Sequence, residues 1–130
     1  MAVGLRVLLV EDDALIAELF AETLSGEGYD VVTARDGQEA LRLFTSADAA
    51  GQGFDIVVTD VRMPRMDGVT LTNRLRSAHP ALPVVLVTGY ASAEQLAALP
   101  SRGRGDEIVV LPKPVDLARL CTVVRSATRH

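Results

Sequence analysis

The stretch FDIVVTDVRMPRMDG, residues 54–68, decides how this chain folds. Its first six residues are mostly apolar or β-branched, which predicts a buried strand, and Asp60 stands where that run ends. A second acid and a glycine, Asp67 and Gly68, close the stretch. A carboxylate at the end of a buried strand costs free energy unless a neighbouring group neutralises it. We therefore expect the fold to place such a group beside Asp60.

Strand-like and helix-like segments alternate on both sides of this stretch. Short apolar runs predict strands at 6–10, 29–34, 54–60, 83–88 and 107–112. Amphipathic spacing predicts helices within 13–28, 36–46, 68–77, 92–99 and 115–128, and the small polar residues 47–53 predict a loop. The alternation favours right-handed crossovers and a parallel sheet with helices on both faces, and the continuous Val/Leu/Ile runs suit doubly covered strands. We predict one α/β domain, residues 1–130, with a five-stranded doubly wound sheet.

The apolar pattern of the first helix includes several large side chains. At helical spacing come Leu15, Ile16, Leu19, Phe20, Thr23 and Leu24, followed by stop signals at Gly26 and Gly28. This pattern predicts an amphipathic helix packed on the sheet.

The composition of the chain argues against membrane proteins, nucleic-acid-binding proteins and disulfide-rich proteins. The chain has 130 residues, 48% of them hydrophobic and 23% charged, which is typical of one soluble globular domain. No apolar run has the length of a membrane span, and the single cysteine, Cys121, excludes an internal disulfide. The net charge of −4 gives no electrostatic footprint for nucleic acid. We expect a cytoplasmic domain with neither a membrane nor a nucleic-acid partner.

Polar residues follow the predicted strands at their carboxyl ends, where open α/β sheets place their functional crevice. The first strand delivers Glu11, Asp12 and Asp13, the third Asp60, the fourth Thr88 and the fifth Lys113. Each has a purely structural interpretation: a turn aspartate, a solvated helix start, a strand threonine or a surface lysine. Their convergence on one edge favours a functional site instead.

The chemistry of this set follows from charge. Carboxylates of Glu11, Asp12 and Asp60 would repel one another and raise at least one pKa unless a cation is present. An all-oxygen ligand set favours a hard ion, and a small open cluster suits Mg²⁺ better than Ca²⁺. An aspartate beside Mg²⁺ and the point charge of Lys113 is well placed to accept a phosphoryl group.

Four motifs in this order, VEDD, DVRMPRMDG, VTGYA and LPKP, resemble the receiver domain of two-component response regulators. The resemblance covers residues 6–127 and includes features of chemotaxis regulators and of receivers attached to hybrid sensor kinases. It implies a flavodoxin-like (βα)5 fold with strand order 2-1-3-4-5 and a site for one Mg²⁺ ion.

The resemblance also implies residue roles. Asp60 would be the phosphorylated residue, Asp12 a direct magnesium ligand, Glu11 a ligand through water and the Arg62 carbonyl a further ligand. Asp13 would begin the first helix, where a carboxylate suits the helix dipole.

Two further residues would act on the phosphoryl group itself. Thr88 would hydrogen-bond it and Lys113 would pair with it, with the Lys113–Pro114 peptide in the cis form. The sequence departs from the family at Val110, where a Tyr or Phe usually accompanies the movement of the threonine. Tyr90 is the nearest aromatic residue, and it is expected either to gate the site or to lie on the surface.

Three functions are compatible with parts of this pattern. The first is a phosphoacceptor switch, in which a histidine kinase or phosphotransfer protein phosphorylates Asp60 and a downstream protein reads the changed surface. Such a domain catalyses only its own Mg²⁺-dependent phosphorylation and dephosphorylation, as a monomer or a weak phosphorylation-dependent dimer. The second is a phosphohydrolase, which commonly carries another aspartate two residues after the first, where this chain has Arg62. The third is a scaffold that binds partners without phosphorylation. The intact acids, Thr88 and Lys113 favour the first.

Overall fold

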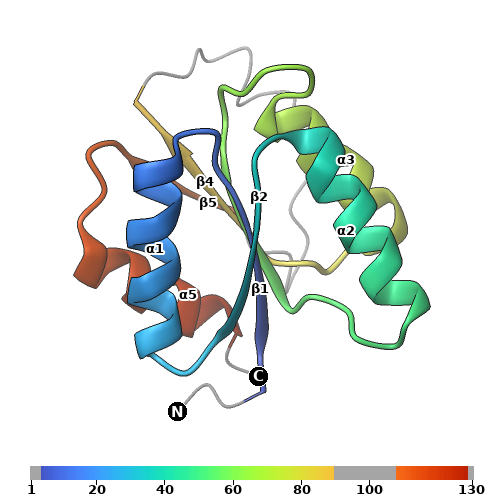
Figure 1. Ribbon diagram of the computed structural model, residues 1–130, viewed down its shortest axis with the longest axis horizontal. Coiled ribbons are helices and arrows are strands. Elements are labelled where there is room, and N and C mark those ends of the chain that lie inside the picture. The colour runs from blue at the N-terminus through green and yellow to red at the C-terminus, as the bar shows by residue number, and fades with distance from the viewer. Residues whose placement is uncertain (1–3, 90–107, 129–130) are drawn as a thin grey trace.

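The computed structural model describes residues 4–89 and 108–128, and these form a parallel sheet between two layers of helices (Figure 1). The strands are β1 (Arg6–Val10), β2 (Asp30–Ala34), β3 (Ile56–Asp60), β4 (Val84–Thr88) and β5 (Ile108–Pro112). They lie in the order β2-β1-β3-β4-β5, and all neighbours are parallel. The predicted fold class and strand order are confirmed. The helix predicted at 92–99, and Tyr90, lie outside the described residues.

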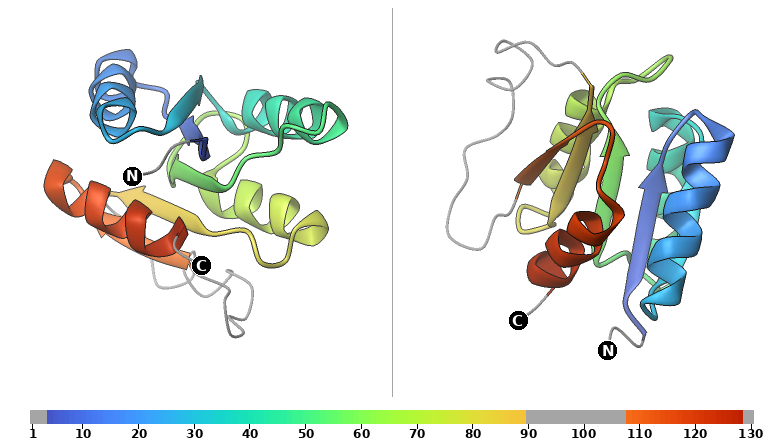
Figure 2. Two further views of the ribbon diagram at one scale, coloured as in Figure 1. Left: turned by 90° about the horizontal axis from the view of Figure 1, so that it is seen from below. Right: turned by 90° about the vertical axis from the view of Figure 1, so that its left-hand side faces the viewer.

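Helices cover both faces of the sheet. They are α1 (Ala14–Gly26), α2 (Gly37–Ala49), α3 (Gly68–Ala78) and α5 (Leu117–Thr128). In Figure 1, α1 and α5 lie on one side of the sheet and α2 and α3 on the other, and the two views of Figure 2 show the same layers. Within the described part of the chain, no helix is both long and apolar enough to cross a bilayer.

Aspartates begin the first three helices. The side chains of Asp13, Asp36 and Asp67 accept hydrogen bonds from backbone amides in the first turns of α1, α2 and α3. Each carboxylate satisfies amides that lack a partner within the helix, and its charge favours the positive end of the helix dipole. The prediction that Asp13 begins the first helix is confirmed.

Two hydrophobic clusters, one on each face, hold the sheet. In β1, Val7 and Leu9 belong to one cluster and Leu8 and Val10 to the other, as expected for side chains that alternate along a strand. All four are at most 1% exposed. This double burial is the reason that the central strands β1, β3 and β4 appear in the sequence as mostly apolar runs, whereas the edge strand β2 is partly exposed.

Strand register aligns the carboxyl ends of the strands. Val10 pairs with Thr59, Asp60 pairs with Val87, and Thr88 pairs with Pro112. The residues that follow β1, end β3 and β4, and follow β5 are therefore brought to one edge of the sheet.

Two expectations about the helices need correction. The loop predicted at 47–53 begins later, because α2 continues to Ala49; the alanines favour helix, and Gly51 adopts φ 73° just beyond the end. The second correction concerns α1, where only some of the apolar residues at helical spacing are buried. Phe20 and Leu24 are buried, whereas Leu15 is 79% and Leu19 47% exposed.

Candidate functional site

Three carboxylates meet at the carboxyl edge of the sheet. Glu11 and Asp12 follow β1, Asp60 ends β3, and one oxygen from each lies within 4.8 Å of the others. Glu11 and Asp60 are 3% and 6% exposed, whereas Asp12 is open to solvent. The predicted acidic cluster (Glu11, Asp12 and Asp60) is thus brought together, with two buried carboxylates and one that is open to solvent.

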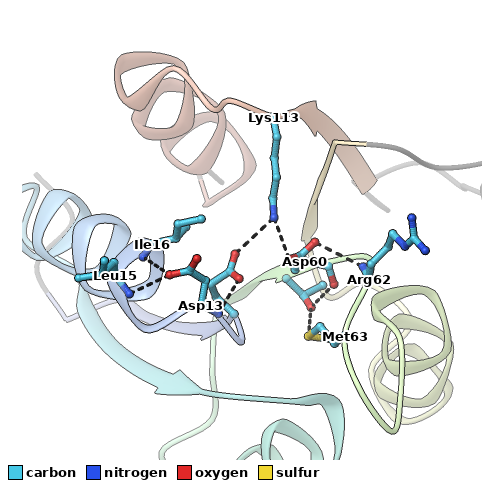
Figure 3. Close-up of polar contacts among 9 residues, drawn as sticks. Asp13, Leu15, Ile16, Asp60, Arg62, Met63 and Lys113 are labelled. Carbon is cyan, nitrogen blue, oxygen red and sulfur yellow. Dashed lines mark hydrogen bonds and ion pairs between the residues drawn. The ribbon is translucent and has the colours of Figure 1, made fainter.

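Lys113 reaches this cluster from the end of β5 (Figure 3). Its Nζ lies 2.9 Å from Oδ2 of Asp60 and 3.8 Å from Oε1 of Glu11. Its backbone N–H donates to the carbonyl of Thr88 at 2.9 Å, which fixes the residue against the end of β4. The Lys113–Pro114 peptide is cis, as the resemblance implied. Lys113 therefore supplies the neutralising group that the position of Asp60 requires.

Burial and charge shift the protonation of two of these groups. Burial raises the pKa of Glu11 from 4.5 to about 7, and the charge of Asp60 adds to the rise, while the Asp13 amide and Lys113 oppose it. Burial lowers the pKa of Lys113, but its hydrogen bond to Asp60 and the charges of the acidic cluster outweigh burial, so the net shift is upward. Burial thus favours the neutral form of Glu11, and the neighbouring acids favour the charged form of Lys113.

The loop after β3, residues 61–67, wraps closely around Asp60. The backbone N–H of Arg62 donates to Oδ1 of Asp60 at 3.4 Å (Figure 3), and Gly68 donates to the carbonyl of Val61 at 2.8 Å. A Cβ on Gly68 would lie 2.3 Å from the Asp60 carbonyl oxygen, so only glycine fits there. The motif glycine thus allows the start of α3 to pass directly over the strand end.

Thr88 is buried near the site, whereas Val110 is partly exposed. Thr88 is buried at the end of β4, beside the β5 residue that precedes Lys113. Its hydrogen bond to a phosphoryl group stays a prediction, as does the ligand role of the Arg62 carbonyl. Val110 is 39% exposed on β5, so its side chain is no part of the buried core.

One set of contacts near the site was not foreseen from the sequence. Asp36 and Gly37, at the start of α2, contact Arg65 and Met66 of the 61–67 loop. The Asp-Gly pair just before a helix is a sequence signal for a helix start, but it does not show which loop will lie against it.

Comparisons with known proteins agree with this geometry. The family model for the response regulator receiver domain matches residues 7–125. Response regulator MprA of Mycolicibacterium vanbaalenii is 38% identical over 125 residues, which are 96% of this chain and 51% of MprA. Sensor kinase CckA of Brucella abortus is 40% identical over 119 residues, which are 92% of this chain and 12% of CckA.

A solved structure shows the same likeness. The crystal structure of the receiver domain from the hybrid histidine kinase CckA is 31% identical, with a TM-score of 0.76, over 95% of this chain and 99% of that one. This chain spans about half of MprA and a smaller part of the kinase, so the likeness is to the receiver portion of each. Receiver domains are phosphoacceptor switches that signal and bind Mg²⁺ at an acidic pocket. The chain belongs to the receiver-domain family of two-component response regulators.

Proposed function

We propose that Asp60 accepts a phosphoryl group from a phosphohistidine of a histidine kinase or of a phosphotransfer protein. One observation carries the proposal: the buried Asp60 carboxylate lies 2.9 Å from Lys113 Nζ and within 4.8 Å of two other acids. A purely structural aspartate would not need both a fixed cation and two further carboxylates around it.

The transfer is balanced by one bond formed and one broken. A carboxylate oxygen of Asp60 forms a bond to phosphorus, while the bond from phosphorus to the histidine nitrogen breaks and the imidazole leaves with that electron pair. The acyl phosphate adds negative charge at the sheet edge. Lys113 is positioned to stabilise that charge, and the hydroxyl of Thr88 would donate a hydrogen bond to a phosphoryl oxygen.

The acidic cluster fits the Mg²⁺ ion that the family implies. Its candidate ligands are all oxygen, and three carboxylates with one oxygen each within 4.8 Å of the others repel one another unless a cation lies between them, which supports the assignment of Mg²⁺. Asp12, Asp60 and the Arg62 carbonyl would hold the ion directly, and Glu11 would hold it through water. When bound, Mg²⁺ neutralises charge on the phosphoryl oxygens. With these groups the domain would catalyse its own phosphorylation and dephosphorylation.

The output would be a changed surface read by a downstream protein. The absence of a nucleic-acid partner, and the monomeric or weakly dimeric state, stay predictions. MprA and CckA are much longer than the region that matches this chain. The identity of the downstream protein or domain is therefore left open in this proposal.

Intact-mass spectrometry tests the phosphoacceptor. We expect one added phosphoryl group after incubation with Mg²⁺ and acetyl phosphate, and none with Asp60→Asn or with a chelator present. Asp13→Asn is a matched control: it removes an adjacent acid, and asparagine still caps α1, so the adduct should persist. The absence of an adduct with acetyl phosphate, phosphoramidate and a phosphorylated histidine kinase would refute the proposal and favour the unphosphorylated scaffold.

A further inference from the structure

The 61–67 loop carries a backbone conformation that requires support. Arg65 has φ 70°, in the left-handed region that non-glycine residues rarely adopt. Such a residue is strained, and it persists only where surrounding contacts hold it. The contacts that hold Arg65 should therefore influence the shape of the whole loop.

One of these contacts is an ion pair between Arg65 and Asp36, the N-cap residue of α2. Nη1 of Arg65 lies 3.5 Å from Oδ2 of Asp36, while Oδ1 of Asp36 accepts a hydrogen bond from the Glu39 amide at 2.9 Å. The Asp36 side chain is 16% exposed and that of Arg65 56%. One carboxylate therefore both begins α2 and holds the side chain of the strained residue.

The second contact is steric. A Cβ placed on Gly37 would lie 2.8 Å from both Cβ and the carbonyl oxygen of Met66. Part of that obstruction is backbone, which cannot rotate away, so even an alanine would push the loop from α2. We call the Asp36–Arg65 pair and the Gly37–Met66 contact the α2 clamp.

The loop is too short and too constrained to absorb a shift at the clamp. It is fixed at its start by the Val61 amide on the Val87 carbonyl at 3.1 Å, and at its end by the Gly68 amide on the Val61 carbonyl at 2.8 Å. Between these points the Met66 amide donates to the Pro64 carbonyl, and proline restricts its own φ. A displacement at Arg65 or Met66 is therefore passed back towards Arg62, next to Asp60.

The clamp also shares a cavity with Asp12, the exposed member of the acidic cluster. Asp12 of the cluster and Asp36, Pro64 and Arg65 line one cavity of about 500 Å³, together with Arg35 and Arg42. The accessible ligand of the cluster and the clamp thus face the same space.

From these contacts we infer that Asp36 and Gly37 are positioning residues for the metal site, acting through the 61–67 loop. They hold the loop in the shape that presents the Arg62 carbonyl, and so raise the affinity for Mg²⁺. Because coupling between sites is reciprocal, Mg²⁺ tightens the first turn of α2 in return. This inference rests on the Mg²⁺ site of the proposed function.

Calorimetric titration of the intact chain with MgCl₂ tests the coupling. An exposed ion pair contributes about 0.2–1 kcal/mol, so Asp36→Asn and Arg65→Gln should each weaken binding by up to about five-fold. Gly37→Ala should weaken it by about ten-fold or more, because it displaces backbone. Each single substitution already removes the ion pair. The variant that carries both substitutions should therefore bind Mg²⁺ no less tightly than the single variant with the lower affinity.

Asparagine keeps the cap of α2, so Asp36→Asn separates the ion pair from helix formation. The matched control is Asp116→Asn, because Asp116 caps α5 in the same way through the amides of Ala118 and Arg119. It removes the same charge from another helix start and should bind Mg²⁺ like the unaltered chain.

Hydrogen exchange supplies a readout that a merely structural role would not move. Saturating Mg²⁺ should slow exchange of the Glu39 amide in the unaltered chain, and clearly less in Asp36→Asn. If every clamp variant binds Mg²⁺ as tightly as the unaltered chain does, this inference is overturned and the proposed function still stands. No Mg²⁺ binding by the unaltered chain would overturn both.

Discussion

The buried carboxylate of Glu11 should make the metal-free domain less stable as the pH rises. Its pKa is 4.5 ordinarily and about 7 in the fold, because the side chain is buried and only 3% exposed. Between these values the folded state keeps a proton that the unfolded state has lost, so raising the pH favours unfolding. Each pKa unit is worth about 1.4 kcal/mol, so about 3 kcal/mol of unfolding free energy is lost by pH 8.

Glu11→Gln isolates this effect. Glutamine retains an oxygen to accept the Asp13 amide, which Glu11 does at 3.0 Å, but it carries no charge at any pH. Relative to the unaltered chain, the variant should therefore gain about 3 kcal/mol between about pH 4.5 and pH 8. Other titrating groups are common to both proteins and largely cancel in the difference.

Urea unfolding followed by circular dichroism, with EDTA present, measures the difference at several pH values across this range. Glu22→Gln makes the same chemical change at an exposed position of α1 and should show no such trend. A constant difference between Glu11→Gln and the unaltered chain from pH 5 to pH 8 would refute the reasoning. It would mean that the Glu11 carboxylate ionises at the same pH in the folded and unfolded chains.

Three further outcomes follow from packing and charge. Lys113→Met removes the cation 2.9 Å from Asp60 and should slow phosphoryl uptake from acetyl phosphate by about 100-fold or more, measured by intact mass over time. Gly68→Ala places a Cβ against the Asp60 carbonyl and should lower the free energy of unfolding by at least about 2 kcal/mol, measured in urea. Leu24→Ala should cost about 3 kcal/mol because Leu24 is fully buried, whereas Leu15→Ala, at 79% exposure, should change stability by less than about 0.5 kcal/mol. Equal costs at these two positions would contradict the packing of α1.

The sheet could be predicted because its signals are local. The central strands β1, β3 and β4 are short, mostly apolar runs buried on both faces, and the edge strands β2 and β5 each keep a short apolar run between turn signals. The end of α2 was less predictable, since Ala47 to Ala49 suit either a helix or a small-residue loop. The exposure of Leu15 could not be predicted either, because helical spacing defines an apolar stripe but does not say how much of it the neighbouring elements cover.

The site was predictable to the extent that it depends on strand ends. Glu11, Asp12, Asp60 and Lys113 each follow or end a predicted strand, and a parallel sheet brings such ends together. The α2 clamp was not predictable, because it depends on a left-handed arginine and on the close approach of Gly37 to Met66. Both arise from packing between elements that are separate in the sequence.

The hydrogen bond between Lys113 and Asp60 joins residues 53 positions apart, and the strand before Lys113 lies at the edge of the sheet. On a ribosome, Asp60 is therefore made long before the lysine that neutralises it. Until β5 docks against β4, the aspartate lacks its fixed cation. A partly synthesised or partly unfolded chain should consequently be a poor phosphoryl acceptor. If Asp60 accepts the phosphoryl group as proposed, its chemistry would thereby depend on the docking of the last strand of the sheet.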